Sequence, residues 1–443
     1  MQMTITERLA TILGRPISDA DRERAASLFL DWTGCSIAGQ KEAAGQKMTD
    51  AFSLAAFSDS DGKCTRIGST PASALMAALH NGALGNVLEM DDVDKRAILH
   101  AAPTIMPAAL AMAQHTNASP TQMFNAIVIG YEATIRIGRA VGAGHYAFWH
   151  NTATCGPFGA AAAACYLLEG SDLVSALGLA GTQAAGLWQT RHEPNSMAKQ
   201  LHASHAAHAG VMGAILSAQG FEGPRQILEG PQGFFAAMCP GANVEDVLTQ
   251  PDASWALHET SIKPYPACRH AHPAIDAALK VHNGADLNSG PILVETYKDA
   301  LTFCDKPVPT SPIQTKFSLQ HSVAITLLNG IPQLEDFTVA VTNSASIKAL
   351  RERIEVVQTD EFNAAYPAHY GAAVTVNGER YVAADAYGDP EYPMTQQAIM
   401  EKAQTLMLYA GMSAKDANRL CSATLALPNA DSLADYIANL PQS

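Results

Sequence analysis

The first 250 residues repeat one helical pattern, in which a proline or serine precedes an alanine-rich stretch that ends at glycine or a polar residue. Proline and serine suit helix N-termini, where a missing N–H donor costs nothing and a hydroxyl can cap the first turn. The pattern predicts helices over residues 25–34, 71–80, 107–114, 120–138, 157–168 and 171–183. Because alanine and glycine let helices approach closely, we expect a tight all-α bundle rather than an α/β sheet.

The pattern changes after about residue 285, where β-branched runs alternate with turn residues. Asn377-Gly378-Glu379 lies between two such runs and is a strong β-hairpin signal. We expect strands over residues 291–297, 354–358, 372–376 and 380–383, a helix over 344–350, and a return to helix over 394–408. The chain is therefore predicted to be mainly α, with a large all-α helical domain built from residues 1–265 and 394–443 and a smaller α+β domain over residues 266–393.

Composition excludes several classes of protein. Of 443 residues, 48% are hydrophobic and 16% are charged, and the net charge of −14 argues against nucleic acid or an anionic membrane as a partner. Eight cysteines are scattered without CxxC pairs, which predicts reduced, buried thiols. Residues 1–15 lack a signal-peptide pattern, and no apolar run reaches the length of a membrane span. We expect a cytoplasmic protein.

A proline-rich segment at residues 261–273 carries two cations, Lys263 and Arg269, and leads into a predicted helix at Pro273. The prolines predict a rigid, extended loop. Fixed cations beside a helix N-terminus would bind a small carboxylate or phosphate. The alternative interpretation is a linker between domains whose basic residues are only solvated.

Three carboxylates, Glu89, Asp91 and Asp92, with Asp94 close behind, precede His100. This combination could form a metal cradle or an acid–base set. The alternative is the C-terminus of a helix running into a solvated acidic turn.

Residues 145–156 place Tyr146, His150 and Thr152 directly before a predicted helix. The helix start could stabilise a developing anion while Tyr146 or His150 transfers a proton. The alternative is a capping segment with core aromatic residues.

Lys199 begins an alanine-rich helical stretch that also contains His202 and His205. Burial would lower the pKa of a lysine at this place toward the range of a general base. The two histidines lie at i and i+3, but zinc needs further ligands and no HExxH motif exists, so no metal is expected. Near residue 316 a second basic segment ends at His321, which could be catalytic or a helix cap.

Motifs for the common cofactor-dependent and hydrolytic enzymes are missing from the sequence. It contains no GxGxxG, Walker A or GxSxG motif and no lysine motif of the pyridoxal phosphate type. Nicotinamide-, ATP- and serine-hydrolase functions therefore have no specific support.

Taken together, these segments resemble the MmgE/PrpD family, which includes 2-methylcitrate dehydratases, cis-aconitate decarboxylases and iminodisuccinate epimerases. The resemblance covers the chain from Asp31 to about Gly388. It is carried by residues 81–103, 130–132, 150–164, 199–210, 220–224, 226–230, 263–276 and 316–330. It implies a helical domain formed by both chain ends, a smaller α+β lid, a homodimer, and proton abstraction next to a carboxylate without a cofactor.

The resemblance also implies roles for individual residues. Family active-site positions fall on Asp92, His100, His150, Lys199, Lys263 and His321. In that scheme Lys263 and Arg269 neutralise the carboxylates of a small di- or tricarboxylate substrate, with Glu89, Thr152 and His321 also binding it. Lys199, Tyr146, His150 and His100 transfer protons.

Departures from the family pattern bear on the reaction. Dehydratases and decarboxylases usually have Asp in place of Glu89, Thr in place of Val93 and Tyr in place of His321, and His-Pro-Gly is replaced by His100-Ala101-Ala102. Lys199 and Tyr146 could act on opposite faces of one carbon. These features predict an isomerase similar to iminodisuccinate epimerase. The alternatives are a lyase of the dehydratase or decarboxylase type and a catalytically inactive carboxylate-binding protein.

Overall fold

A computed structural model of the chain describes residues 3–54, 57, 62–193, 195–282, 287 and 290–441. Contacts divide the chain into two units. The larger unit consists of Met1–Thr260 and Thr395–Ser443, and the smaller unit of Ser261–Met394. The sequence placed the corresponding boundaries at 265/266 and 393/394.

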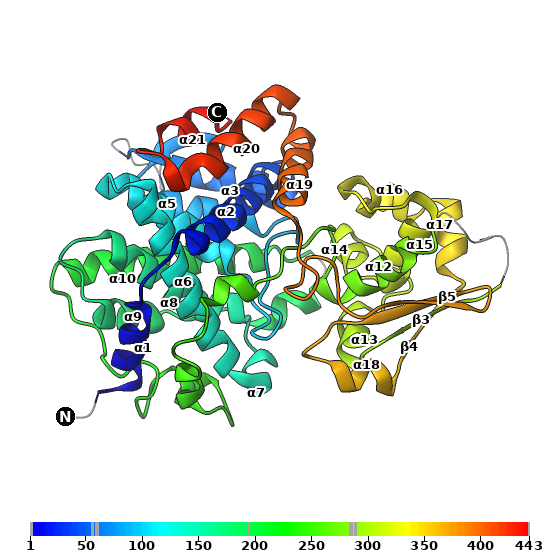
Figure 1. Ribbon diagram of the computed structural model, residues 1–443, viewed down its shortest axis with the longest axis horizontal. Coiled ribbons are helices and arrows are strands. Elements are labelled where there is room, and N and C mark those ends of the chain that lie inside the picture. The colour runs from blue at the N-terminus through cyan, green and yellow to red at the C-terminus, as the bar shows by residue number, and fades with distance from the viewer. Residues whose placement is uncertain are drawn as a thin grey trace. The chain divides into compact units, whose positions relative to one another are not determined.

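Helices build the larger unit (Figure 1). They are α1 (Ile5–Leu13), α2 (Asp19–Gly39), α3 (Ala43–Phe52), α4 (Ala74–Gly85), α5 (Ala102–Thr116), α6 (Pro120–Ala140), α7 (Gly142–Tyr146), α8 (Asn151–Leu167), α9 (Leu173–Gly181), α10 (Ala198–Ala218) and α11 (Phe234–Met238), with α19 (Gln396–Tyr409), α20 (Ala414–Ala426) and α21 (Ala434–Asn439) from the C-terminal part. A two-stranded antiparallel ladder joins β1 (Cys64–Arg66) to β2 (Ser69–Ala72).

Small residues explain how closely the central helices of this unit pack. α8 packs against both α6 and α10. A Cβ added at Gly210 of α10 would lie 2.3 Å from the Cβ of Ala160 in α8, and one at Gly130 of α6 would lie 2.9 Å from the Gly159 carbonyl oxygen. Any larger side chain would force these helices apart, so the alanine- and glycine-rich composition is a packing requirement.

Two prolines predicted at helix starts lie inside helices instead. Pro107 is in the second turn of α5, which begins at Ala102, and Pro157 is in the second turn of α8, which begins at Asn151. A proline in this position removes one backbone hydrogen bond, which the buried helix tolerates. Pro71 was also predicted to begin a helix, but it lies in β2, and Ser73 caps α4.

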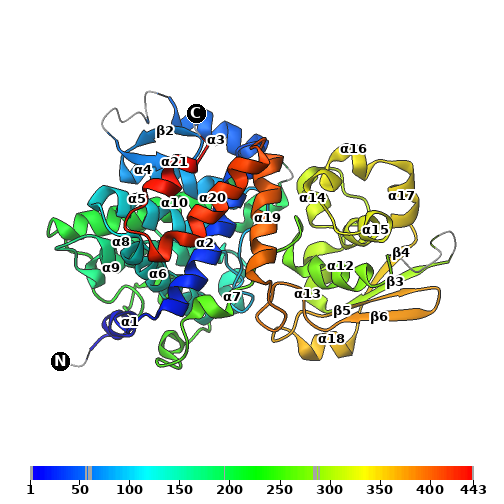
Figure 2. The ribbon, with the colours of Figure 1, turned by 45° about the horizontal axis from the view of Figure 1, so that its top comes forward.

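Gly34 was expected to end a helix, and this prediction is wrong. α2 continues through it to Gly39. A Cβ at position 34 would lie 3.0 Å from the Cα of Ala403 in α19. The glycine therefore permits the contact between α2 and α19, which run alongside one another in Figure 2.

The smaller unit is a four-stranded sheet with helices packed against it. Its strands are β3 (Ile292–Thr296), β4 (Ile354–Gln358), β5 (Ala372–Val376) and β6 (Glu379–Ala383), in the order β4-β3-β5-β6, and only the β3–β4 pair is parallel. Its helices are α12 (His272–Leu279), α13 (Lys298–Cys304), α14 (Pro312–Lys316), α15 (Leu319–Asn329), α16 (Val339–Thr342), α17 (Ala345–Arg351) and α18 (Asp360–Ala365).

The predicted hairpin in the smaller unit is confirmed. Val376 pairs with Glu379, so the turn consists of Asn377 and Gly378, whose φ angles are 54° and 82°. Positive φ at both turn positions is the type I′ geometry that matches the twist of the strands. α12 and α15 lie over this sheet in Figure 1.

The predicted fold class, mainly α with a smaller α+β part, is confirmed. All eight cysteines are buried thiols, as expected. Among the described residues, none of the helices is both long and apolar enough to cross a bilayer.

A buried ion pair joins the two chain segments of the larger unit. Lys402 of α19 places Nζ 2.5 Å from Oδ1 of Asp31 in α2, and both side chains are at most 5% exposed. The same Nζ donates a hydrogen bond to the carbonyl oxygen of Met90, at 2.5 Å. Burial opposes the charge on Lys402, but the Asp31 carboxylate outweighs it and the pKa of Lys402 is raised. Lys402 therefore holds α2 and the segment around Met90 together.

Replacing Lys402 by methionine should strongly destabilise the protein. Lys402→Met leaves the Asp31 carboxylate buried without its ammonium partner, which typically costs about 3–5 kcal/mol. The free energy of unfolding in urea measures the loss.

The double variant Asp31→Leu/Lys402→Met should recover most of that loss, because two apolar side chains leave no buried charge. Lys348→Met, in the exposed Lys348–Glu352 pair of α17, is the matched control and should cost less than about 0.5 kcal/mol. Equal losses for Lys402→Met and Lys348→Met would contradict this account.

Candidate active site

The acidic segment between α4 and α5 is buried. Glu89, Asp91, Asp92 and Asp94 are each at most 2% exposed, so the interpretation as a solvated acidic turn is wrong. A buried carboxylate is costly unless it has partners. Each of the four has a different set of partners, and those partners define the site.

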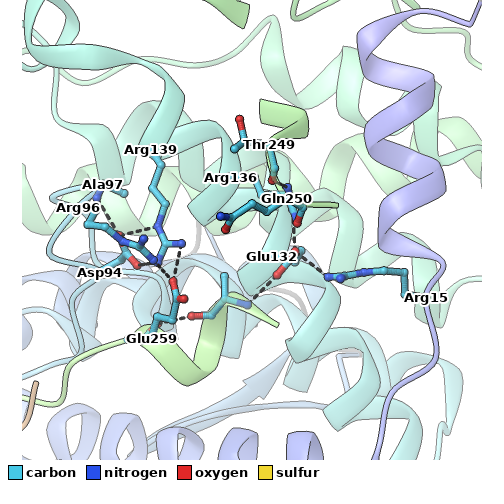
Figure 3. Close-up of polar contacts among 12 residues, drawn as sticks. Arg15, Asp94, Arg96, Ala97, Glu132, Arg136, Arg139, Thr249, Gln250 and Glu259 are labelled. Carbon is cyan, nitrogen blue, oxygen red and sulfur yellow. Dashed lines mark hydrogen bonds and ion pairs between the residues drawn. The ribbon is translucent and has the colours of Figure 1, made fainter. Parts of the chain in front are cut away.

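Asp94 holds the segment in place. Its carboxylate accepts hydrogen bonds from the backbone N–H of Ala97 and from Arg139 of α6. Figure 3 shows Arg139 between Asp94 and Glu259, with Arg96 also paired to Glu259. The arginine compensates the cost of burying this carboxylate. Asp94 is therefore a structural anchor.

A second buried carboxylate in the same region also serves the fold. Glu132 of α6 accepts hydrogen bonds from Arg15, at 2.8 Å, from Arg136, at 2.6 Å, and from the backbone N–H of Ala256, at 2.7 Å (Figure 3). These contacts connect α6 to the N-terminal segment and to the chain near residue 256.

The groups that donate hydrogen bonds to Asp92 are neutral. Its Oδ2 accepts from the hydroxyl of Tyr131, at 2.8 Å, and its Oδ1 from the backbone N–H of Ala102 at the start of α5, at 3.0 Å. Burial, reinforced by the neighbouring Asp91 charge, raises the pKa of Asp92 to about 7. Near neutral pH this carboxyl group can therefore either hold or release a proton.

Asp91 orients His100. Nδ1 of His100 lies 2.8 Å from the Asp92 carbonyl oxygen and 3.1 Å from Oδ2 of Asp91, which also accepts a hydrogen bond from Asn86, at 2.7 Å. Because both neighbours of Nδ1 are acceptors, Nδ1 carries the proton. In the neutral ring, Nε2 then has the lone pair, which is the arrangement of a general base.

The segment is also fastened to the first turn of α8. The backbone N–H of His100 donates to Oγ1 of Thr152, at 3.0 Å, and the side chain of Asn151 donates to the Ala97 carbonyl oxygen, at 2.7 Å. Thr152, predicted to bind substrate, thus contacts the backbone of His100. Its role in substrate binding stays a prediction.

His150 is the residue that precedes α8, and it is 1% exposed. Its Nδ1 lies 3.2 Å from Nδ1 of His202 in α10, and its ring centroid is 4.5 Å from that of Trp188. Burial, followed by the charges of Lys199, His202 and His100, holds the pKa of His150 well below its usual range. The ring is neutral at physiological pH. The charges of Lys199 and His100 act on it, so these groups lie in the same neighbourhood.

Lys199, in the first turn of α10, forms an ion pair with Glu89. Glu89 has a φ of 60°, an uncommon conformation for a residue other than glycine, which points to a position imposed by its surroundings. The side chain of Lys199 is 16% exposed. It is therefore not the isolated, buried amine that the sequence predicted, and its contact with Glu89 is that of a hydrogen-bond donor.

Tyr146 lies at the end of α7, where it is partly buried. Its ring meets Trp188 edge-on, with the centroids 5.6 Å apart. Trp188 thus contacts both Tyr146 and His150, and links the two predicted proton carriers.

The remaining predicted site residues belong to the smaller unit. Arg269 donates to Asp389, at 2.5 Å, and to the carbonyl oxygens of Ala386 and Tyr387. Nε2 of His321 lies 2.9 Å from the Asp336 carbonyl oxygen, and burial lowers the pKa of His321 to about 4. Lys263 is 1% exposed. Substrate binding by these three residues stays a prediction.

Sequence reasoning missed several of these partners. Asn86, Tyr131 and Trp188 were not among the predicted site residues, Asp91 was named only as a member of the acidic cluster, and His202 was considered only as a zinc ligand. Adjacency to Asp92 was a signal for Asp91, and i,i+3 spacing from Lys199 was one for His202. Tyr131 and Asn86 carry no local signal, because their contacts depend on the tertiary fold.

Among the described residues, the group spaced closely enough to hold a metal ion lies elsewhere. It consists of His369, Asp385 and Glu391 of the smaller unit, whose ligand atoms are within 4.8 Å of one another. His202 and His205, the pair considered from sequence, do not form such a group.

Comparison with known protein families accounts for most of the chain. The model of the MmgE/PrpD N-terminal domain matches residues 4–246, and that of the MmgE/PrpD C-terminal domain matches residues 265–426. Together the matched ranges contain the acidic segment, His150, Lys199 and His321, whereas Lys263 lies between the two ranges.

Several characterised proteins are similar to the chain over long stretches. A cis-aconitate decarboxylase-like protein, OryM, from Aspergillus oryzae is 27% identical over 86% of this chain and 85% of its own length. Cis-aconitate decarboxylase from Aspergillus terreus is 28% identical over 69% of this chain and 67% of its own. The 2-methylcitrate dehydratase of Escherichia coli K12 is 26% identical over 45% of this chain and 43% of its own.

Asp92→Asn should flatten the pH dependence of stability. The folded protein keeps a proton on Asp92 that the unfolded chain releases, because the pKa rises from 3.8 to about 7 on folding. The resulting contribution to the free energy of unfolding is fully present below pH 3.8 and is lost as the pH rises through about 7. The free energy of unfolding changes by about 4 kcal/mol over this range. Urea unfolding at a series of pH values between 5 and 8.5 measures this slope.

The exposed Asp435, changed to Asn, serves as the control and should leave the slope of the wild-type protein intact. A wild-type slope in Asp92→Asn would show that Asp92 ionises normally in the folded protein, contrary to this interpretation.

Proposed function

The chain belongs to the MmgE/PrpD family, and from that premise we propose that it is a lyase that removes carbon dioxide or water from a small tricarboxylate. The observation that carries the proposal is the gathering of two imidazoles, His100 and His150, at the first turn of α8, with Lys199 in the electrostatic field of His150. Beside a negatively charged substrate, dehydration needs a base and an acid, and decarboxylation needs an acid that protonates carbon.

The relatives favour a lyase over the isomerase that the sequence departures indicated. The three relatives are named a cis-aconitate decarboxylase-like protein, a cis-aconitate decarboxylase and a 2-methylcitrate dehydratase, and the first two match over two thirds or more of both chains. We therefore adopt the lyase alternative as the main proposal. The raised pKa of the buried Asp92 argues against an inactive binding protein, because strongly perturbed pKa values cluster at functional sites.

In a decarboxylation, the bond between the substrate carbon and the leaving carboxylate breaks, and the electron pair stays on the carbon skeleton. Carbon dioxide leaves, and an acid returns one proton to carbon. In a dehydration, a base removes a proton from the carbon next to a carboxylate, and an acid protonates the departing hydroxyl, which leaves as water. His100 through Nε2, or the neutral ring of His150, fits the base, and Asp92, which can hold a proton near neutral pH, fits the acid.

Cations complete the proposed site. Lys199 lies beside His150, where an ammonium group would stabilise the carboxylate of a bound substrate and the charge that develops on it. Lys263, in the smaller unit, is a further buried cation for which carboxylate binding stays a prediction. Since the guanidinium of Arg269 is engaged by Asp389 and two carbonyl oxygens, we assign Arg269 to holding the loop that carries Lys263.

Proton NMR in D2O tests the proposal. The protein is incubated with cis-aconitate, 2-methylcitrate or iminodisuccinate, and the spectra follow substrate loss, alkene formation and deuterium incorporation. We expect net conversion of a tricarboxylate to a new alkene. Deuterium at the α carbon of the amino-dicarboxylate without net loss would favour the isomerase, and thermal stabilisation without either reaction would favour a binding protein.

Variants connect the reaction to the site. His100→Asn and His150→Asn should each lower kcat by about 100-fold or more, because they remove a proton carrier. His115→Asn, an exposed histidine at the other end of α5, is the control and should leave kcat intact. Retained activity in both site variants would remove these histidines from the mechanism.

We also propose that the protein is a homodimer. Family resemblance implies it, and the larger unit exposes several large apolar side chains near the site: Phe148, Leu187, Met197 and Leu201 are 69%, 56%, 42% and 48% exposed. Exposed apolar side chains in one region are typical of interfaces. Light scattering should give twice the chain mass of 46.7 kDa, and Leu187→Asp should shift it toward one chain. A single-chain mass for the wild-type protein would overturn the proposal.

A further inference from the structure

His202 faces His150 across a shared hydrogen bond. His202 lies three residues after Lys199 on α10, so both side chains project from one face of the helix. Its Nδ1 is 3.2 Å from Nδ1 of His150, and the two ring centroids are 5.4 Å apart. Two nitrogens at this separation need one hydrogen between them, so one ring donates and the other accepts.

Charge on either ring is disfavoured. Burial is the main cause that lowers the pKa of both rings, well below the usual range for His150 and to about 4 for His202, and Lys199 adds repulsion. Both rings are therefore neutral at physiological pH. A neutral pair with one shared Nδ1 proton must place its other proton on the Nε2 of the accepting ring, so each histidine determines the tautomer of the other.

Gly186 makes the close approach possible. Its carbonyl oxygen accepts a hydrogen bond from the backbone N–H of His150, at 2.9 Å. Its φ is 140°, and a Cβ there would lie 2.4 Å from the Cβ of Ala153 and 3.4 Å from the ring of His202. Position 186 therefore accepts only glycine while His150 and His202 keep this geometry.

The two rings also differ in exposure. His150 is 1% exposed, whereas His202 is partly exposed. A proton that reaches His150 has a path through His202 toward water. The i,i+3 neighbour His205 stacks against His208 instead, with centroids 6.4 Å apart, and takes no part in this pair.

We propose that His202 is a positioning and relay residue, which fixes the tautomer of His150 and passes protons between His150 and solvent. When His150 takes a proton at Nε2, its Nδ1 proton moves to Nδ1 of His202, and His202 releases its own Nε2 proton to water. One proton is transferred, no electrons move, and both rings end neutral with exchanged tautomers. The relay during turnover rests on the proposed function, but the tautomer pairing does not.

His202→Asn separates positioning from relay. The Asn amide can occupy the place of Nδ1 and hold His150, but it cannot pass a proton on. We expect kcat to fall about 100-fold while KM changes little, and we expect added imidazole to restore part of the loss by carrying protons in place of the missing ring. His205→Asn, one turn further along α10, is the matched control and should behave as wild type. An unchanged kcat in His202→Asn, or a loss that imidazole does not repair, would overturn the relay.

Nitrogen-15 NMR of histidine-labelled protein tests the pair without any substrate. One Nδ1 of the pair should be protonated and the other bare, with neither ring charged between pH 6 and 8. Exchange of the His150 ring proton with water should slow at least about 10-fold in His202→Asn, since the path to solvent is removed. Two Nε2–H tautomers, a charged His202, or unchanged exchange would each overturn the proposal. If the pairing is found but no carboxylic acid is converted, the proposed lyase function fails and the pair stands.

Discussion

The contact of Lys402 with Asp31 and with the Met90 carbonyl oxygen is the interaction on which the larger unit depends. It joins helix α19, from the end of the chain, to helix α2, from its beginning, and to the segment that carries Asp91 and Asp92. Each charge would be expensive to bury alone, so removing either partner should destabilise the contact between these elements. The site is therefore supported by residues that are more than 300 positions apart in the sequence.

Four buried carboxylates in one short segment have separate chemical roles because their partners differ. Asp94 is paired with arginine and anchors the loop, whereas Asp92 accepts hydrogen bonds from a phenol and an amide and has its pKa raised to about 7. Asp91 orients the ring of His100, and Glu89 forms an ion pair with Lys199. The positions of the cations, more than the number of acids, decide which carboxyl group can take part in proton transfer.

Local signals in the sequence predicted the fold well where the structure is locally determined. The Asn377-Gly378 turn needs only two positive φ angles, and alanine-rich stretches were enough to place most of the long helices of the larger unit. Prediction failed where tertiary contacts override local preference: Pro107 and Pro157 are accommodated inside buried helices, and Gly34 serves the approach of Ala403. In the site, the residue types and their segments were foreseeable, but pairings such as Asp91 with His100 and His150 with His202 follow from packing alone.

The division of the chain also has a consequence for its synthesis. The larger unit is interrupted by the continuous segment Ser261–Met394 and is completed only by Thr395–Ser443. On the ribosome, the whole smaller unit is synthesised before α19. Until then, Asp31 of α2 cannot form its ion pair with Lys402. The acidic segment can thus reach its final form only after almost the entire chain has been translated, so a prematurely terminated product would carry every predicted proton carrier and still lack the helix that supports them.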